Sequence, residues 1–398
     1  MIASALGVIV AALVLAVAVE LGSRWWIRRR TGYYVWPPGY RLELRQDPEV
    51  CAAIEPRVRF YINRDGERGD DVRRDEAGVC RILVVGGSAA ECLALDQPTS
   101  WPGALERLLS EPESRRILGA RRVHVGNIGR SGIGSERLDL ILERVLPRYR
   151  RLAALVVMVG ASDVLEWLED GTPPLLGPSS VRAAGTFGCH PEQPFGWRPR
   201  TWATLEVARR LRRSWFPRLE VRERAGAWLV AARKMRAQAK EVRQIVPDPT
   251  PIVDRFEYHF RRLLQRAKAH ADGVLVARQP WFEKDYTAEE IAHFWHGGSG
   301  KAWKEPVTVY YSLQVMNRLM GLVDARAATV AEELGIEHVD LRRSLPPSLA
   351  HYFDSFHFTP AGAAIVARTV AAALLRRPLR PDEAVAPVVP RPWAVSTP

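Results

Sequence analysis

The sequence predicts an α/β fold, a three-layer α/β/α sandwich around a central parallel sheet, with one N-terminal transmembrane helix and a helical insertion. First, short runs of aliphatic and β-branched residues alternate with stretches of helical periodicity, which is the pattern of βα units. Second, glycine-rich or polar loops follow these runs, at the edge where parallel strands carry ligand sites. Third, the first nineteen residues are almost all apolar, which is enough to cross a bilayer.

The expected elements follow one another at spacings typical of βα units. The first strand, Arg81–Val85, contains four successive aliphatic residues, which indicates burial on both faces. Gly86 and Gly87 then allow a sharp turn. The other strands are expected at 122–125, 154–159, 273–277 and 336–341, and helices near 101–109, 136–146 and 361–375.

The N-terminal segment Met1–Val19 contains no charged side chain, and Glu20 is the first. The flank Arg24-Trp25-Trp26-Ile27-Arg28-Arg29-Arg30 has the aromatic and basic residues of a membrane interface. No small-residue cleavage site precedes this flank, so we interpret the segment as an uncleaved single-pass anchor rather than a signal peptide. The positive-inside rule places the arginine-rich side, and the rest of the chain, in the cytoplasm.

The composition favours a folded protein over a disordered one, since 47% of the 398 residues are apolar. The formal net charge is +12, but only six of the 57 basic residues are lysine, and we find no zinc-binding cysteine pairs or Walker loop. We therefore predict no nucleic-acid partner. Cys51 and Cys80 are compatible with a disulfide or with free thiols, and Cys92 lies beyond the glycine turn, where it could line a pocket but is not the expected nucleophile. The sequence makes no prediction of the oligomeric state.

Two stretches near opposite ends of the chain carry the candidate chemistry. Ser88 follows two glycines at the end of the first strand, where a hydroxyl on a tight turn is exposed for attack. Asp354 and His357 are three residues apart, just before Thr359 and Pro360, which suit the N-cap and first position of the last helix. Such a loop can place the carboxylate on one imidazole nitrogen while the other faces a nucleophile. Taken alone, the first stretch is also compatible with an ordinary turn and the second with helix capping.

With two further loops, these stretches resemble the ordered sequence blocks of SGNH/GDSL hydrolases. The blocks are Gly86-Gly87-Ser88, Asn127-Ile128-Gly129-Arg130-Ser131-Gly132, Gly160-Ala161-Ser162-Asp163 and Asp354-Ser355-Phe356-His357. The resemblance runs roughly from Phe60 to Leu375, and its first ten residues are similar to the lead-in of membrane-anchored bacterial members.

The resemblance implies a flavodoxin-like sandwich and a serine esterase site. It implies Ser88 as nucleophile, His357 as base and Asp354 as the residue that orients the base. The oxyanion hole would consist of the Ser88 and Gly132 backbone amides and the Ser162 side chain.

The sequence departs from the family pattern at two positions. The acidic residue that usually precedes the serine is Gly87, a common variation among the membrane-anchored members. The asparagine that usually completes the oxyanion hole is Ser162. A hydroxyl donates from a shorter side chain than an amide does, so we expect weaker stabilisation of the oxyanion.

Composition and element pattern, together with the resemblance, divide the chain. We expect a transmembrane anchor at 1–22, a juxtamembrane lead-in at 23–80 that wraps the domain, an SGNH hydrolase domain at 81–376 with a helical insertion at about 171–250, and a Pro-rich tail at 377–398. Residues 201–244 in the insertion are expected to be helical. There, Trp202, Leu205, Ala208, Leu211 and Trp215 share one helical face, which predicts either packing on the core or a collar against anionic lipid head groups.

A second variable stretch, 281–305, follows the fourth strand and is expected over the same carboxyl edge as Ser88. Its aromatic residues would either stack on a substrate or pack the loop. His293 and His296 stand at helical spacing but have no evident acidic or cysteine partner, so no metal site is assigned.

The resemblance implies hydrolysis of an O-acyl ester, with O-acetyl as one candidate, on a glycan or a lipid of the bacterial envelope. It implies no cofactor and an extracytoplasmic catalytic domain, in conflict with the arginine count. Two alternatives are an O-acyltransferase with the same triad and a weakly catalytic or non-catalytic glycan-binding assembly protein. The Ser162 substitution favours the last alternative, whereas the intact triad residues oppose it.

Overall fold

Five parallel strands form the central sheet of the computed structural model, which describes residues 2–73, 76–175, 177, 181–193, 195–215, 218–377, 379 and 381. They are β3 (Val79–Gly86), β4 (Arg122–Asn127), β5 (Leu152–Met158), β8 (Ala271–Arg278) and β10 (Glu337–Asp340). Their order is β10-β8-β5-β3-β4, with every neighbouring pair parallel, which is the flavodoxin-like order. The predicted α/β fold with a central parallel sheet is confirmed, and each of the five expected strands overlaps an observed one.

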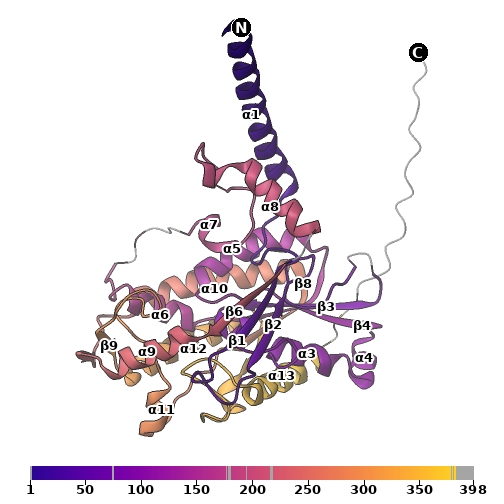
Figure 1. Cartoon of the computed structure of the whole chain (residues 1–398). Helices are drawn as coiled ribbons and strands as arrows, with labels where there is room; N and C mark the ends of the chain where they lie inside the picture. The colour runs from indigo at the N-terminus through magenta and orange to yellow at the C-terminus, as the bar shows by residue number, and fades with distance from the viewer. Residues whose placement is uncertain are drawn as a thin grey trace.

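Helices cover both faces of this sheet (Figure 1). One layer contains α5 (Ser135–Val145), α6 (Ala161–Glu169), α10 (Thr250–His270) and α12 (Leu313–Glu333), and the other contains α3 (Trp101–Leu109), α4 (Pro112–Leu118) and α13 (Pro360–Leu375). The alternation of side chains along β3 divides it between two cores: Leu83 and Val85 belong to the first layer's core, and Ile82 and Val84 to the second's. Burial on both faces explains why this strand is apolar at every position from Ile82 to Val85.

Shorter elements complete the chain. They are the helices α2 (Ser88–Glu91), α7 (Ala183–Thr186) and α11 (Ala288–Ala292), and the 3₁₀ turns Leu146–Arg148, Pro199–Thr201 and Leu341–Arg343. Among the predicted helix ends, that of α13 is confirmed: Thr359 is its N-cap, accepting a hydrogen bond from the Gly362 amide at 3.3 Å, and Pro360 is its first residue.

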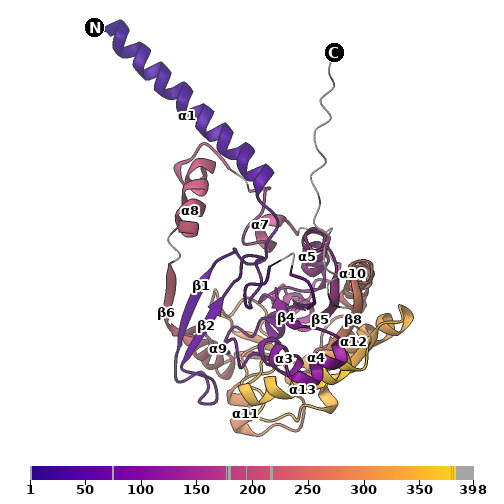
Figure 2. The ribbon, with the colours of Figure 1, turned by 90° about the vertical axis from the view of Figure 1, so that its right-hand side faces the viewer.

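The lead-in and one strand of the insertion form a second, smaller sheet, which was not expected from the sequence. Strands β1 (Arg41–Gln46) and β2 (Arg57–Tyr61) pair antiparallel, and β6 (Leu219–Ala225) adds in parallel to β1. Figure 2 shows this sheet at one side of the main domain. Its inner residues form a separate small core: Leu42, Leu44, Val58, Phe60 and Ile62.

The expectation of helix throughout 201–244 is wrong. The stretch contains α8 (Ala203–Trp215), β6, α9 (Ala227–Ala237) and β7 (Glu241–Arg243), the last paired with β9 (Val309–Tyr311). The reason is visible around β6, where Leu219 and Val221 alternate with charged residues at the two-residue period of a strand. Strand β6 forms because its backbone hydrogen-bonds to the free edge of β1.

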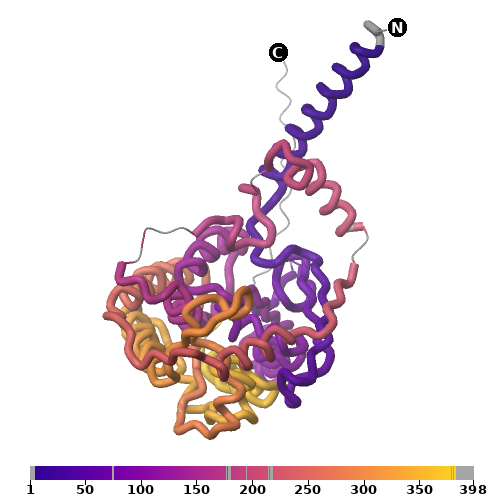
Figure 3. Tube along the Cα trace, turned by 60° about the vertical axis from the view of Figure 1, so that its left-hand side comes forward, coloured from indigo at the N-terminus to yellow at the C-terminus, as the bar shows by residue number. Residues whose placement is uncertain are grey.

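Helix α1 (Ile2–Arg30) projects from the body of the molecule (Figures 1 and 3). Residues 5–19 are exposed along its length, and Glu20 is the first buried residue. The helix is long and apolar enough to cross a membrane. Most of the expected Pro-rich tail at 377–398 lies outside the described residues.

Candidate active site

The turn after β3 positions Ser88 at the carboxyl edge of the sheet. A Cβ on Gly86 would lie 1.9 Å from the Met158 carbonyl oxygen, so the backbone can pass β5 this closely only at a glycine. Ser88 is the first residue of α2, with a partly exposed side chain. The chain places β4 on one side of β3 and β5 on the other, so Ser88 lies at the topological switch point where ligands bind in such sheets.

The structure brings His357 and Asp354 to this serine across most of the chain. His357 Nε2 lies 2.8 Å from Ser88 Oγ, and His357 Nδ1 lies 2.7 Å from Asp354 Oδ2. A nucleophile that contacts a base, which in turn contacts an orienting carboxylate, is the arrangement needed for nucleophilic acyl transfer.

The Asp354 carboxylate is fully buried and is satisfied by several donors. Besides the imidazole, Oδ1 accepts the backbone amides of Phe356 and His357, each at 2.9 Å, and Oδ2 accepts the Trp295 indole N–H at 3.0 Å. Burial alone would raise the pKa of Asp354, but the neighbouring His357 and these hydrogen bonds hold it well below its ordinary value. Burial opposes the charged form of His357, but the Asp354 charge outweighs it, so the pKa of His357 is raised.

Two residues near the triad, Trp295 and His296, were not predicted from the sequence to lie there. The Trp295 indole holds Asp354, and the His296 ring lies 5.7 Å from the His357 ring, centroid to centroid. Burial lowers the pKa of His296 to about 3, so this second histidine is neutral. Both residues fall in the variable stretch 281–305, which was expected at the carboxyl edge of the sheet. Their positions in the sequence do not indicate a contact with the loop of Asp354 and His357, about sixty residues later.

Within that stretch, most of the aromatic residues pack the loop. Phe294 and Trp295 are buried, and Phe282 stacks against Tyr352 with ring centroids 5.5 Å apart. Trp303, in contrast, is 53% exposed. Of the two expectations for these aromatics, loop packing therefore holds for Phe294 and Trp295.

Helix α9 of the insertion fastens this loop and the triad loop together. Arg233 donates to the backbone carbonyls of His293 at 2.9 Å and Phe353 at 2.8 Å. Arg236 donates to the His296 carbonyl, and the Trp228 ring meets Trp295 edge to face at 4.9 Å. A helix from the insertion thus supports the residues that hold Asp354.

The expected oxyanion side lies in the loop that follows β4. Asn127 braces this loop, accepting the Gly129 amide and donating to the Ala90 carbonyl, both at 2.8 Å. The buried Glu91 carboxylate accepts the Ser131 amide at 2.7 Å and also the Ser131 hydroxyl, directly before Gly132. Burial raises the pKa of Glu91. Gly132 is exposed and has a φ of +72°, which favours glycine.

Ser162 lies beside the turn that carries Ser88. It is the second residue of α6, and its Oγ would lie 3.1 Å from a Cβ placed on Gly87. A side chain at position 87 would therefore crowd Ser162. Asp163, the next residue, accepts the Ser135 amide at 2.9 Å and so caps the start of α5.

Among the described residues, one group has atoms close enough to hold a metal ion: His296, Asp354 and His357, within 4.8 Å of one another. Asp354 and His357 are already hydrogen-bonded to each other and to Trp295 and Ser88. A metal would have to displace these bonds, so we assign this group to the triad and propose no metal site.

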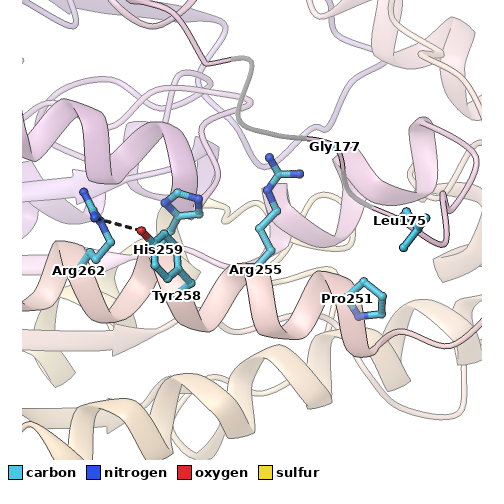
Figure 4. Close-up of a pocket in the computed structure, with 7 residues that line it drawn as sticks. All are labelled: Leu175, Gly177, Pro251, Arg255, Tyr258, His259 and Arg262. Carbon is cyan, nitrogen blue, oxygen red and sulfur yellow. Dashed lines mark hydrogen bonds between the residues drawn. The ribbon is translucent and has the colours of Figure 1, made fainter.

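A hollow along α10 lies apart from the triad (Figure 4). It is lined by Leu175, Gly177, Pro251, Arg255, Tyr258, His259 and Arg262. Its arginines already have acidic partners: Arg255 pairs with Glu136 at 2.9 Å, and Arg262 with Asp139 at 2.8 Å. Because these charges are compensated, we do not assign the hollow to the reaction.

The cysteines do not compete with Ser88 as the nucleophile. Cys92 is buried, and burial raises the pKa of its thiol to about 12, which keeps it protonated near neutral pH. Cys51 is a partly exposed free thiol, so it is not joined to Cys80.

Comparison with known proteins gives distant structural likenesses only. No protein-family model matches the chain, and no curated protein matches it. An acetylxylan esterase from Geobacillus stearothermophilus is similar with a TM-score of 0.40 and 16% identity, covering 76% of this chain and 96% of that one. An alpha/beta hydrolase enzyme from the metagenome of Lake Arreo, Spain, is similar with a TM-score of 0.39 and 13% identity, covering 76% and 98%. At these values, neither likeness carries an argument about function.

Proposed function

We propose that the protein is a membrane-anchored serine esterase of the SGNH type. The observation that carries the proposal is the chain of contacts from Ser88 Oγ to His357 Nε2 at 2.8 Å and from His357 Nδ1 to Asp354 at 2.7 Å. A serine at the surface does not require a histidine that is itself fixed by a fully buried carboxylate. Nucleophilic acyl transfer does need one.

In the proposed reaction, Ser88 Oγ attacks the ester carbonyl while its proton passes to His357 Nε2. Asp354 holds the proton on Nδ1 and stabilises the imidazolium that forms. The tetrahedral oxyanion is held by the amides of Ser88 and Gly132 and by the Ser162 hydroxyl. The Ser88 amide suits this role because it is the first of α2 and has no helical carbonyl partner. His357 then protonates the leaving alkoxide, and water, activated by the same base, releases the acid.

The substrate class follows from the resemblance to SGNH hydrolases. We propose an O-acyl group, such as O-acetyl, on a glycan or lipid near the membrane. Helix α1 supplies the anchor. Its Glu20 caps helix α8, because the carboxylate accepts the Ala203 amide at 2.9 Å and the Thr204 amide at 3.0 Å. Cleavage of α1 as a signal peptide would remove that cap. We propose an extracytoplasmic domain, as the resemblance implies.

The test compares Ser88→Ala with the unchanged chain in hydrolysis of an aryl acetate and in acetate release from an O-acetylated xylo-oligosaccharide. We expect loss of turnover with the melting temperature unchanged, because the substitution removes one partly exposed hydroxyl. Ser110→Ala, which removes another partly exposed serine hydroxyl at the end of α3, is the control and should retain activity. Retained turnover in Ser88→Ala, or no turnover in the unchanged chain, would refute the proposal.

A further inference from the structure

Helix α8 has an unusual orientation, because it covers an ion pair while its large apolar side chains are exposed. Glu206 and Arg210 pair at 2.9 Å, and their side chains are only 14% and 15% exposed. Arg210 also donates to the Thr31 hydroxyl at the end of α1. On the other face, Leu205 is 41% exposed, Leu211 is 40% exposed and Trp215 is 70% exposed. In a helix packed on a soluble core, these apolar side chains would be the buried ones.

The position of α8 is set by α1. The Glu20 carboxylate of α1 accepts the first amides of α8, from Ala203 and Thr204, and also the Thr204 hydroxyl at 2.9 Å. Figures 2 and 3 show α8 beside the lower part of α1 and away from the central sheet. The 18 residues between Ile2 and Val19 span roughly 27 Å at helical rise, close to the thickness of a hydrocarbon core. Glu20, and with it the start of α8, therefore lies where the apolar span ends.

Basic side chains surround the exposed apolar face. On α8, Arg209, Arg212 and Arg213 are exposed, and on the last turn of α1 Arg28, Arg29 and Arg30 are exposed as well. No acidic residue follows Glu206 within α8. An apolar stripe flanked by arginines at the end of a membrane span is complementary to the boundary between acyl chains and anionic head groups.

We propose that α8 lies in the membrane interface, with Leu205, Leu211 and Trp215 among the acyl chains and its exposed arginines at anionic phosphates. This goes beyond the catalytic proposal and rests only on its anchor. The surface contact would fix the orientation of the whole body, because α8 continues towards β6, which pairs with β1 of the lead-in sheet. The active site would then be held at a set angle to the bilayer rather than swinging on α1.

The test uses the full chain in vesicles whose acyl chains carry bromine, which quenches tryptophan fluorescence on contact. One set is phosphatidylcholine alone, and the other also contains phosphatidylglycerol. The difference in quenching between the unchanged chain and Trp215→Phe isolates Trp215, because the tryptophans of α1 are common to both. Trp303→Phe is the control, since Trp303 is 53% exposed but belongs to the loop before β9, an element that lies well apart from α1 and α8 (Figure 1).

We expect Trp215→Phe to remove a clear share of the quenching in anionic vesicles and Trp303→Phe to remove none. The Trp215 share should fall at least twofold in neutral vesicles and in the triple variant Arg209→Gln, Arg212→Gln, Arg213→Gln. Equal effects of Trp215→Phe and Trp303→Phe would overturn the proposal. So would a Trp215 shielded from both lipid bromine and aqueous acrylamide, which would indicate a protein partner. Failure of the anchor itself is distinguishable, because the chain would then not float with the vesicles.

Discussion

His357 and Ser162 both approach the Ser88 turn, but the chain holds them very differently. His357 is fixed by a buried carboxylate that is itself bonded to two backbone amides and an indole. Within the described part of the chain, no hydrogen bond fixes the Ser162 hydroxyl, and Gly132 in the neighbouring loop is exposed. The base side of the proposed site is thus preorganised, whereas its proposed oxyanion side would combine two backbone amides, on a turn and a braced loop, with a rotatable hydroxyl. Hydrogen-bond donors that already point at the developing negative charge usually contribute most to such catalysis. We therefore expect a lower kcat than the well-ordered His357–Asp354 pair would give with a fully ordered oxyanion hole.

The largest effect should come from removing the base. His357→Ala should lower kcat by about 10⁴-fold or more, because His357 Nε2 is the group that the described residues place against Ser88 Oγ as a base. Asp354→Ala should cost less, since orienting carboxylates are the most dispensable of the three. Turnover of an aryl acetate, with thermal unfolding as the fold control, measures both. A smaller loss in His357→Ala than in Asp354→Ala would contradict the assigned roles.

The oxyanion side should respond in the opposite direction. Ser162→Asn should raise kcat, by up to about a hundredfold, with little change in KM, because the amide reaches the oxyanion chiefly in the transition state. Ser162→Ala should lower kcat only modestly. If Ser162→Asn were inert and Ser162→Ala cost a hundredfold, the hydroxyl would already be an adapted donor and the contrast between the two sides would disappear.

Loosening the Gly132 loop should have an intermediate effect. Glu91→Ala removes the carboxylate that accepts the Ser131 amide, so the neighbouring Gly132 amide can drift, and we expect kcat to fall roughly tenfold or more. Glu91→Gln keeps an acceptor oxygen and serves as the matched control, with activity near that of the unchanged chain. Equal losses in the two variants would show that the charge, rather than the position of the loop, matters.

The smallest effect should come from removing one brace of the base side. Trp295→Phe keeps an aromatic ring at this position but removes the N–H donor to Asp354, so we expect less than a tenfold loss of kcat. Without that donor the carboxylate attracts the imidazolium more strongly, and the already raised pKa of His357 should rise further.

The base must be neutral to accept the proton. Activity should therefore fall as the pH drops through the pKa of His357, and this limb should move to higher pH in Trp295→Phe. The pH profile of kcat/KM measures the shift, and an unmoved limb would show that Trp295 only packs the loop.

The central sheet could be read from the sequence because its strands are short, mostly apolar and each followed by a polar or glycine loop. The same pattern places Ser88 at the carboxyl edge, and the Thr359 and Pro360 signals locate the loop of Asp354 and His357. Local periodicity and capping chemistry are enough for these features.

Features that depend on distant partners could not be read in this way. The strand β6 exists because β1 offers an edge, and Trp295 holds Asp354 because α9 fastens two loops together. The sequence predicts an apolar stripe along α8, but it does not predict whether this stripe faces the core or the solvent. The contact of α8 with Glu20 decides this, because it fixes the position of the helix. In each case, the deciding contact joins residues far apart in the chain.

Labelling with a fluorophosphonate tests the central claim most directly, because this reagent reacts with an activated serine and not with an ordinary one. The full chain is incubated with the reagent, digested, and the modified peptide is identified by mass spectrometry. We predict a single adduct on Ser88, slowed strongly in His357→Ala and absent in Ser88→Ala. An adduct at another serine, or none under conditions that label a known serine esterase, would contradict the assignment of Ser88 as the nucleophile.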